Sequence, residues 1–152
     1  MGASSVRQLL EQTADRRSSY GGGSAAAFSC ALAAALVEKL AGRTGSATTA
    51  RRLRACCTRL IEADAQAFAR VVRAGARQDR QTLRRALTVA TDIPCQVGEC
   101  AQQVLSIARR IRARVSPSYR VDLDCAQALA RAAKQSAQAL VTANRAWIRQ
   151  LP

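Results

Sequence analysis

Residues 21–40 read GGGSAAAFSCALAAALVEKL, and this stretch decides the fold. From residue 24 to residue 40 it predicts one helix that is apolar on every side until Glu38 and Lys39. A helix that is apolar all round has to be buried all round. Its small side chains would let neighbouring helices approach closely. We therefore predict a buried central helix in an all-α, multi-helix bundle.

Outward from this helix, capping residues and apolar periodicity predict five further helices. Ser4 or Ser5 would cap the first helix, Thr48 or Thr49 the third, and Asp92 a helix that begins close to Pro94. Asp122 stands where a cap of the last helix would act. The predicted helices cover residues 4–15, 24–40, about 49–74, 81–90, about 92–113 and 122–150.

Length and composition agree with this fold class. The chain has 152 residues, which fits a single domain over residues 1–152 with a core of its own. Apolar residues make up 49% of it and aromatic residues only 3%, a balance that suits alanine-rich helices better than a sheet. Proline occurs only at Pro94, Pro117 and Pro152, which leaves long stretches free to be helical.

The formal net charge of +14 raises the question of a nucleic-acid partner. Lysine occurs only at Lys39 and Lys134, and the arginines are dispersed along several segments rather than collected in one basic arm. This dispersion disfavours nucleic acid. A small anionic substrate is the interpretation that we prefer for the same charge.

The chain has six cysteines and no histidine, which limits the metal and redox chemistry that it could support. No Cys-x-x-Cys pair is present, so the sequence predicts no metal site. Without a secretory signal pattern, we interpret the cysteines as small buried thiols of a cytoplasmic protein. The longest apolar stretch, residues 25–37, is too short to span a bilayer, so we expect no membrane partner.

Several segments, in order along nearly the whole chain, resemble the family of formiminotransferase-cyclodeaminase C-terminal domains and methenyltetrahydrofolate cyclohydrolases. The first is the triglycine opening of the central helix, preceded by the helix that contains SVRQLL at residues 5–10. The others are Asp64-Ala65-Gln66-Ala67-Phe68, Ala90-Thr91-Asp92-Ile93-Pro94, Pro117 with Asp122, and Asn144 in the last helix.

The resemblance implies a helical fold, a homodimer and an enzyme acting on a one-carbon tetrahydrofolate. The reaction would be cyclodeamination of formimino-tetrahydrofolate or hydrolysis of methenyl-tetrahydrofolate, and neither requires a metal or a redox cofactor. The chain departs from the family pattern at Tyr20, where proline is usual, at Ser116 and Ser118, which replace two asparagines, at Val121 and at Leu140.

Both reactions need a positioned acid or base, and without histidine a carboxylate is our candidate. Asp64 lies within an apolar helical stripe, where desolvation would raise its pKa. Asp122 lies at a helix N-terminus, where the helix dipole favours the ionised form. We predict that Asp64 and Asp122 are the catalytic pair if they converge in space. The alternatives are a structural buried acid for Asp64 and a plain helix cap for Asp122.

The substrate-binding candidates surround the triglycine. Gly21, Gly22, Gly23 and Ser24 present backbone N–H groups at a helix start, which predicts an anion site; tight helix packing is the alternative. Tyr20 and Tyr119, with Phe28, are candidates for stacking on a flat ring, or else core residues. The resemblance adds Asn144 to the site.

Two other functions stay open at this point. The same fold could serve cyclisation, deamination or ring hydrolysis of a different small molecule in specialised metabolism, as the departures from the family motifs suggest. It could also be a non-catalytic helical binding protein. Retention of Asp64 and Asp122 in one cleft without folate binding would favour the first, and a cleft filled by side chains would favour the second.

Overall fold

A computed structural model describes residues 5–151, and within this range every regular element is a helix. The all-α prediction is confirmed, with one α-helix fewer than expected. The elements are α1 Val6–Ala14, α2 Gly22–Ala41, α3 Gly45–Ala76, α4 Arg80–Ile111 and α5 Arg120–Gln150, with short 3-10 turns η1 Arg112–Arg114 and η2 Pro117–Tyr119 between the last two.

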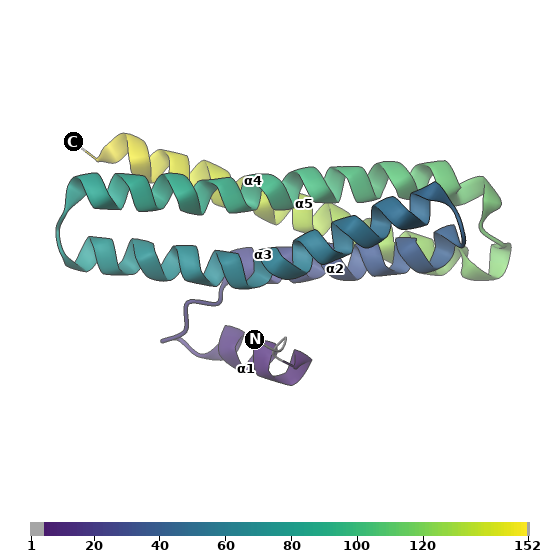
Figure 1. Cartoon of the computed structure of the whole chain (residues 1–152), viewed down its shortest axis with the longest axis horizontal. Helices are drawn as coiled ribbons and strands as arrows, with labels where there is room; N and C mark the ends of the chain where they lie inside the picture. Colours follow the sequence, from purple (N-terminus) through teal and green to yellow (C-terminus); the bar gives the residue numbers. More distant parts are fainter. Residues whose placement is uncertain (1–4, 152) are drawn as a thin grey trace.

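The four long helices form a bundle in which α2, α3, α4 and α5 each pack against the next, and α5 packs back against α2 (Figure 1). α2 also contacts α4 across the centre. α1 lies below this bundle and is joined to it by residues 15–21 (Figure 1). Ser5 caps α1 through a capping box with Gln8, in agreement with the prediction, while Ser4 lies outside the described residues.

Two helices begin earlier than the sequence pattern predicts. Thr44, not Thr48 or Thr49, caps α3 by accepting a hydrogen bond from the backbone N–H of Ala47. Asp79 caps α4 in the same way, through the backbone N–H of Thr82 at 3.1 Å. Because three or four residues of a helix can follow a cap before its apolar stripe begins, the stripe alone placed these starts too late.

The helix break predicted before Pro94 is wrong, because α4 continues through this proline. Asp92 is therefore an exposed residue inside α4 and not an N-cap. A proline in a helix interior leaves the carbonyl four residues earlier without its N–H donor. Here that carbonyl belongs to Ala90, and the side chain of Asn144 on α5 donates to it at 3.4 Å. An interaction with another helix thus replaces the missing bond.

α2 is the central helix, but it is not buried all round. Half of its residues are buried, while Ala25 is exposed and Leu32 is 43% exposed. By length and composition, this 20-residue helix could also cross a membrane, which corrects the expectation from residues 25–37. Such a match is weak evidence, since the core helix of a bundle has the same composition. α2 packs here against α3, α4 and α5.

The thiols are free throughout. Cys30, Cys57 and Cys100 are buried where α2, α3 and α4 meet, as predicted for packing residues. Burial raises the pKa of the Cys56 thiol, beside this group. Cys125 is exposed on α5, so the prediction of buried thiols does not extend to it.

Candidate active site at the start of α2

The bundle has four helices along only part of its length. α3 and α4 have 32 residues each and α5 has 31, whereas α2 has 20 and stops at Gly22 (Figure 1). Beyond the start of α2, a cavity of about 160 Å³ lies among the other three helices. We call it the slot; its lining residues are Ser19, Gly21, Gly22, Gly23, Asp64, Phe68, Val71, Leu87, Ala90, Pro94, Leu140, Asn144 and Trp147.

Asp64 of α3 meets the start of α2 at the edge of the slot. Its carboxylate lies against Gly23, where any side chain would collide with it. The Ser24 hydroxyl is within hydrogen-bonding distance of Asp64 Oδ2 at 3.1 Å and of the Ile61 carbonyl at 3.0 Å. Ser24 is buried inside α2 and does not cap it. Gly23 is therefore required for the close approach of a carboxylate.

The chain's own carboxylate thus stands where the sequence predicted a bound anion. The first N–H groups of a helix have no intrahelical partners and attract negative charge. Gly21, the N-cap residue of α2, offers no side chain to satisfy them. Asp64 lies beside these groups at Gly23 and Ser24. An external anion at this point would meet a like charge, so the start of α2 suits a neutral or cationic group of a ligand.

The pKa of Asp64 is raised, as predicted. Burial is the main cause, because desolvation disfavours the charged carboxylate. The hydroxyl and the backbone N–H of Ser24 act in the opposite direction and offset part of this effect. Asp64 is therefore a carboxyl group with a raised pKa, which accepts a proton more readily than an exposed aspartate does.

Asn144 also lines the slot, on the wall opposite α3. Its side-chain amide donates to the Ala90 carbonyl that Pro94 leaves without an N–H donor. The Ala90–Pro94 segment and Asn144 are therefore parts of one arrangement, although they are about fifty residues apart in sequence. Asn144 has a structural role that the sequence did not reveal, in addition to its place in the wall.

Two aromatic side chains stand at the slot. Phe68 of α3 is 47% exposed and Trp147 of α5 is 43% exposed, although both are large and apolar. Exposed aromatic groups beside a cavity are available to pack on a flat ring. The sequence indicated Tyr20, Tyr119 and Phe28 for this role and overlooked Trp147. The periodicity of α5 could have found it, since Trp147 follows Leu140 and Asn144 by seven and three residues.

Tyr20 lies next to the slot and not in it. Its hydroxyl donates a short hydrogen bond to the Glu62 carboxylate, which is the main reason that the Tyr20 pKa is raised to about 12. Tyr20 and Phe28 line a second, mostly apolar cavity of about 280 Å³ between α1 and the bundle. With its pKa so high, Tyr20 is a hydrogen-bond donor and not a base near neutral pH.

Asp122 and Tyr119 lie at the other end of α2. Asp122 pairs with Lys39 at 3.2 Å, and the Lys39 ammonium stands 5.6 Å from the centre of the Tyr119 ring. Asp64 instead contacts Ser24, so the two carboxylates are separated by about 22 Å of α2. The structure does not bring Asp64 and Asp122 together within one chain. Asp122 lies in the first turn of α5 and is not its N-cap.

No group of three or more His, Cys, Asp or Glu side chains that could hold a metal ion is found among residues 5–151. The ionisable side chain in the slot is a single carboxylate. Proton transfer is the chemistry that such a site supports directly.

The profile of the formiminotransferase-cyclodeaminase family matches residues 5–150. The chain belongs to the formiminotransferase-cyclodeaminase family. The resemblance drawn from the triglycine and the later motifs is confirmed.

A solved structure supports the fold of this family member. The formiminotetrahydrofolate cyclodeaminase of Thermotoga maritima superimposes with a TM-score of 0.88 at 21% sequence identity, over 97% of this chain and 81% of the other. At this identity the likeness shows the fold alone. No curated protein is similar enough in sequence to count as a match.

Four of the segments that carried the resemblance meet at one place in the structure. The triglycine, Asp64 with Phe68, Pro94 and Asn144 all line the slot. Leu140, which stands where the resemblance leads one to expect an asparagine, lies in the same wall and makes the slot more apolar. The Ser116–Ser118 and Asp122 positions lie outside it.

Proposed function

We propose that this chain is an enzyme that acts on a one-carbon derivative of tetrahydrofolate at the slot. The family supports the class of reaction, and the cyclodeaminase of Thermotoga maritima shares the fold. The observation that carries the proposal is the Asp64 carboxyl group, held with a raised pKa against Gly23 and Ser24 at the mouth of a mostly apolar cavity. Phe68 and Trp147 provide the aromatic surface on which a pterin ring can pack.

Asp64 acts as the proton carrier of the proposed reaction. In cyclodeamination, a folate nitrogen attacks the formimino carbon, the attacking nitrogen loses its proton, and the departing amine needs one to leave as ammonia. The ionised Asp64 takes the first proton and, once protonated, gives one to the amine. In hydrolysis, Asp64 takes a proton from the water that attacks the cationic methenyl carbon. The protonated Asp64 then gives this proton to the ring nitrogen whose bond to that carbon breaks, while the new hydroxyl group loses its proton to solvent and becomes the formyl carbonyl. Each route passes through a cationic carbon centre, which a carboxylate stabilises.

No metal or cofactor has a part in this proposal, since both reactions move only protons and a nucleophile. In this proposal Gly23 leaves room for Asp64, and Gly21 and Gly22 leave room for the ligand at the start of α2. The negative groups of the predicted anionic substrate would then lie away from the start of α2, where the positive charge of the chain attracts them.

Leu140 favours a second candidate, a different small molecule bound in the same slot. A leucine in place of a polar side chain removes a hydrogen-bonding group from the wall that would recognise a folate ring. A cyclic amidine with fewer polar edges would fit this wall, and Asp64 would serve ring closure or ring hydrolysis in the same way.

The proposal is tested with purified protein and two assays. The first supplies formimino-tetrahydrofolate and measures ammonia together with methenyl absorbance, and the second follows the loss of absorbance of methenyl-tetrahydrofolate. We expect turnover in one assay, lost in Asp64→Asn and kept in Asp92→Asn, an exposed aspartate of α4. Absence of turnover in both assays with folded protein would overturn the folate proposal and leave the second candidate.

A further inference from the structure

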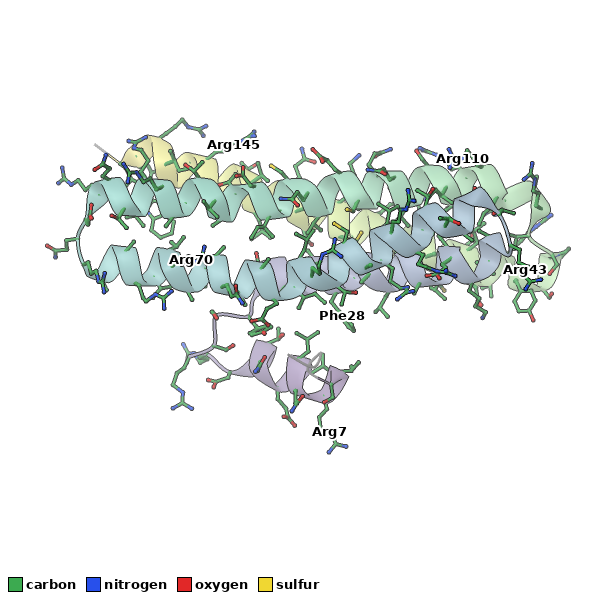
Figure 2. All side chains as sticks on the ribbon, viewed as in Figure 1. Arg7, Phe28, Arg43, Arg70, Arg110 and Arg145 are labelled. Carbon is green, nitrogen blue, oxygen red and sulfur yellow. The ribbon has the colours of Figure 1, made fainter. Side chains whose placement is uncertain are left out.

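Four arginines line a groove between the end of α3 and the start of α4, and the groove has no lining residue in common with the slot. Its volume is about 330 Å³. We call it the arginine groove; its lining residues are Arg70, Arg73, Ala74 and Arg77 of α3 and Thr82, Arg85, Ala86 and Val89 of α4. Figure 2 labels Arg70 on α3, in the half of the helix that leads to the α3–α4 turn.

The sequence gathers these side chains by helical spacing. Arg70, Arg73 and Arg77 are three and four residues apart, so they lie on one face of α3. Arg85 and Val89 are four residues apart on the facing helix. Ala74 and Ala86 are small, and they let the two helices approach. Arginines from both walls therefore face one hollow.

No arginine of the groove has an ion-pair partner within residues 5–151. Glu62 accepts a hydrogen bond from Tyr20, and Asp79 caps α4 through Thr82. The hydrogen bonds from Thr82 and, to a smaller extent, the attraction of Arg85 lower the pKa of Asp79, but Asp79 and Arg85 form no ion pair. Four like charges on one hollow repel each other, and this repulsion lowers the stability of the folded chain. An anion bound among them would remove that repulsion.

We propose that the arginine groove binds a compact polyphosphate, either inorganic or the phosphate chain of a nucleoside triphosphate. A guanidinium group offers a planar pair of N–H donors that matches phosphate oxygens in a bidentate way. A triphosphate chain carries several negative charges in a small volume, which suits four guanidinium groups around one hollow. A single phosphate would leave most of them unpaired. This site does not depend on the function proposed for the slot.

Calorimetric titration at 0.15 M salt tests the proposal with tripolyphosphate, ATP and orthophosphate. We expect tripolyphosphate to bind, orthophosphate to bind at least tenfold more weakly, and Arg73→Gln/Arg77→Gln to weaken tripolyphosphate binding by about tenfold or more. Arg109→Gln/Arg110→Gln is the matched control, because it removes two exposed arginines from the far end of α4. Arg85→Gln repeats the test from the other wall. If ATP binds as tightly as tripolyphosphate does, the groove recognises the phosphate chain that the two ligands share.

The result that would overturn the proposal is an equal loss of affinity in the two double variants, because binding would then follow overall charge. Absence of heat at millimolar tripolyphosphate would do the same. A 12-nucleotide RNA serves as a further competitor. If it bound the wild-type protein more tightly than tripolyphosphate does, and if both double variants lost RNA affinity equally, binding would reflect unspecific attraction of nucleic acid to the basic surface. That result would also contradict the proposal. Circular dichroism of each variant confirms that it is folded before titration.

Discussion

Gly23 shows how closely the backbone of α2 approaches the carboxylate of Asp64, the candidate acid. A methyl group on Gly23 would collide with the Asp64 carboxylate, whereas one on Gly21 meets open space and one on Gly22 meets only Leu140 at 3.9 Å. The three glycines are therefore not equivalent. The sequence indicated the triglycine as a unit, and only the position of Asp64, forty residues later, separates their roles.

Gly23→Ala is expected to destabilise the chain by roughly 1–3 kcal/mol, because the added carbon forces Asp64 or α2 to move. It should also abolish turnover at the slot. Thermal unfolding of Gly23→Ala beside Gly22→Ala measures the effect. The control adds the same methyl group one residue earlier, and it should be neutral or slightly stabilising. Equal destabilisation by both substitutions would show that the glycines act through chain flexibility.

Asp64→Asn is expected to stabilise the folded chain at neutral pH. Burial raises the pKa of Asp64 in the folded state, so its contribution to stability is full below the unfolded pKa of about 4 and is lost as pH rises through the folded value. An asparagine has the same shape and no charge to desolvate. Unfolding midpoints in denaturant at pH 3 and pH 7 should converge at the lower pH. A variant that is less stable than wild type at pH 7 would contradict the raised pKa.

At the scale of the helix, α4 shows where sequence patterns fail. Pro94 is a sound reason to predict a helix break, and the donor that permits continuation comes from Asn144 on α5. Local periodicity contains no information about a partner that is far away in sequence. The same limit applies to Asp64 and Asp122, which fit an acid and base pair by type and environment but lie at opposite ends of α2.

A double-mutant cycle at Pro94 and Asn144 tests this arrangement. Asn144→Ala alone should cost about 1 kcal/mol, because it leaves the Ala90 carbonyl without a partner. In a Pro94→Ala background, the restored N–H of residue 94 satisfies that carbonyl, and the loss should shrink by about 0.5–1 kcal/mol. Chemical denaturation of the four proteins gives the coupling energy. Additive effects would mean that Asn144 acts independently of the proline.

At the scale of the whole molecule, the site exists because one helix of the bundle is shorter than the other three. The helix lengths predicted from the sequence were accurate enough to identify an all-α bundle. The sequence also indicated Asp64, the triglycine and Asn144 as candidate site residues. It did not predict the slot, since a cavity depends on which helix ends lie side by side. Cytoplasmic location stays a prediction.

The exposed side of α2 bears on the predicted homodimer. Ala25, Ser29 and Leu32 lie along the side of α2 that the other helices leave partly open, and small residues of α2 and α5 line an adjoining groove. Small residues permit close packing of helices from two chains. We predict a homodimer, seen as twice the mass of 16.2 kDa in sedimentation velocity at micromolar concentration, and Leu32→Arg should shift it to monomer. A wild-type monomer at that concentration would contradict the prediction.

The central claim is that Asp64 at the slot, and not Asp122 at the other end of α2, carries the proton in a folate reaction. The most direct measurement is kcat for methenyl-tetrahydrofolate hydrolysis and for formimino-tetrahydrofolate cyclodeamination in wild type, Asp64→Asn and Asp122→Asn. We predict a loss of about 10²- to 10⁴-fold for Asp64→Asn and a rate within a few-fold of wild type for Asp122→Asn. Turnover that survives in Asp64→Asn, or that is lost only in Asp122→Asn, would contradict the claim.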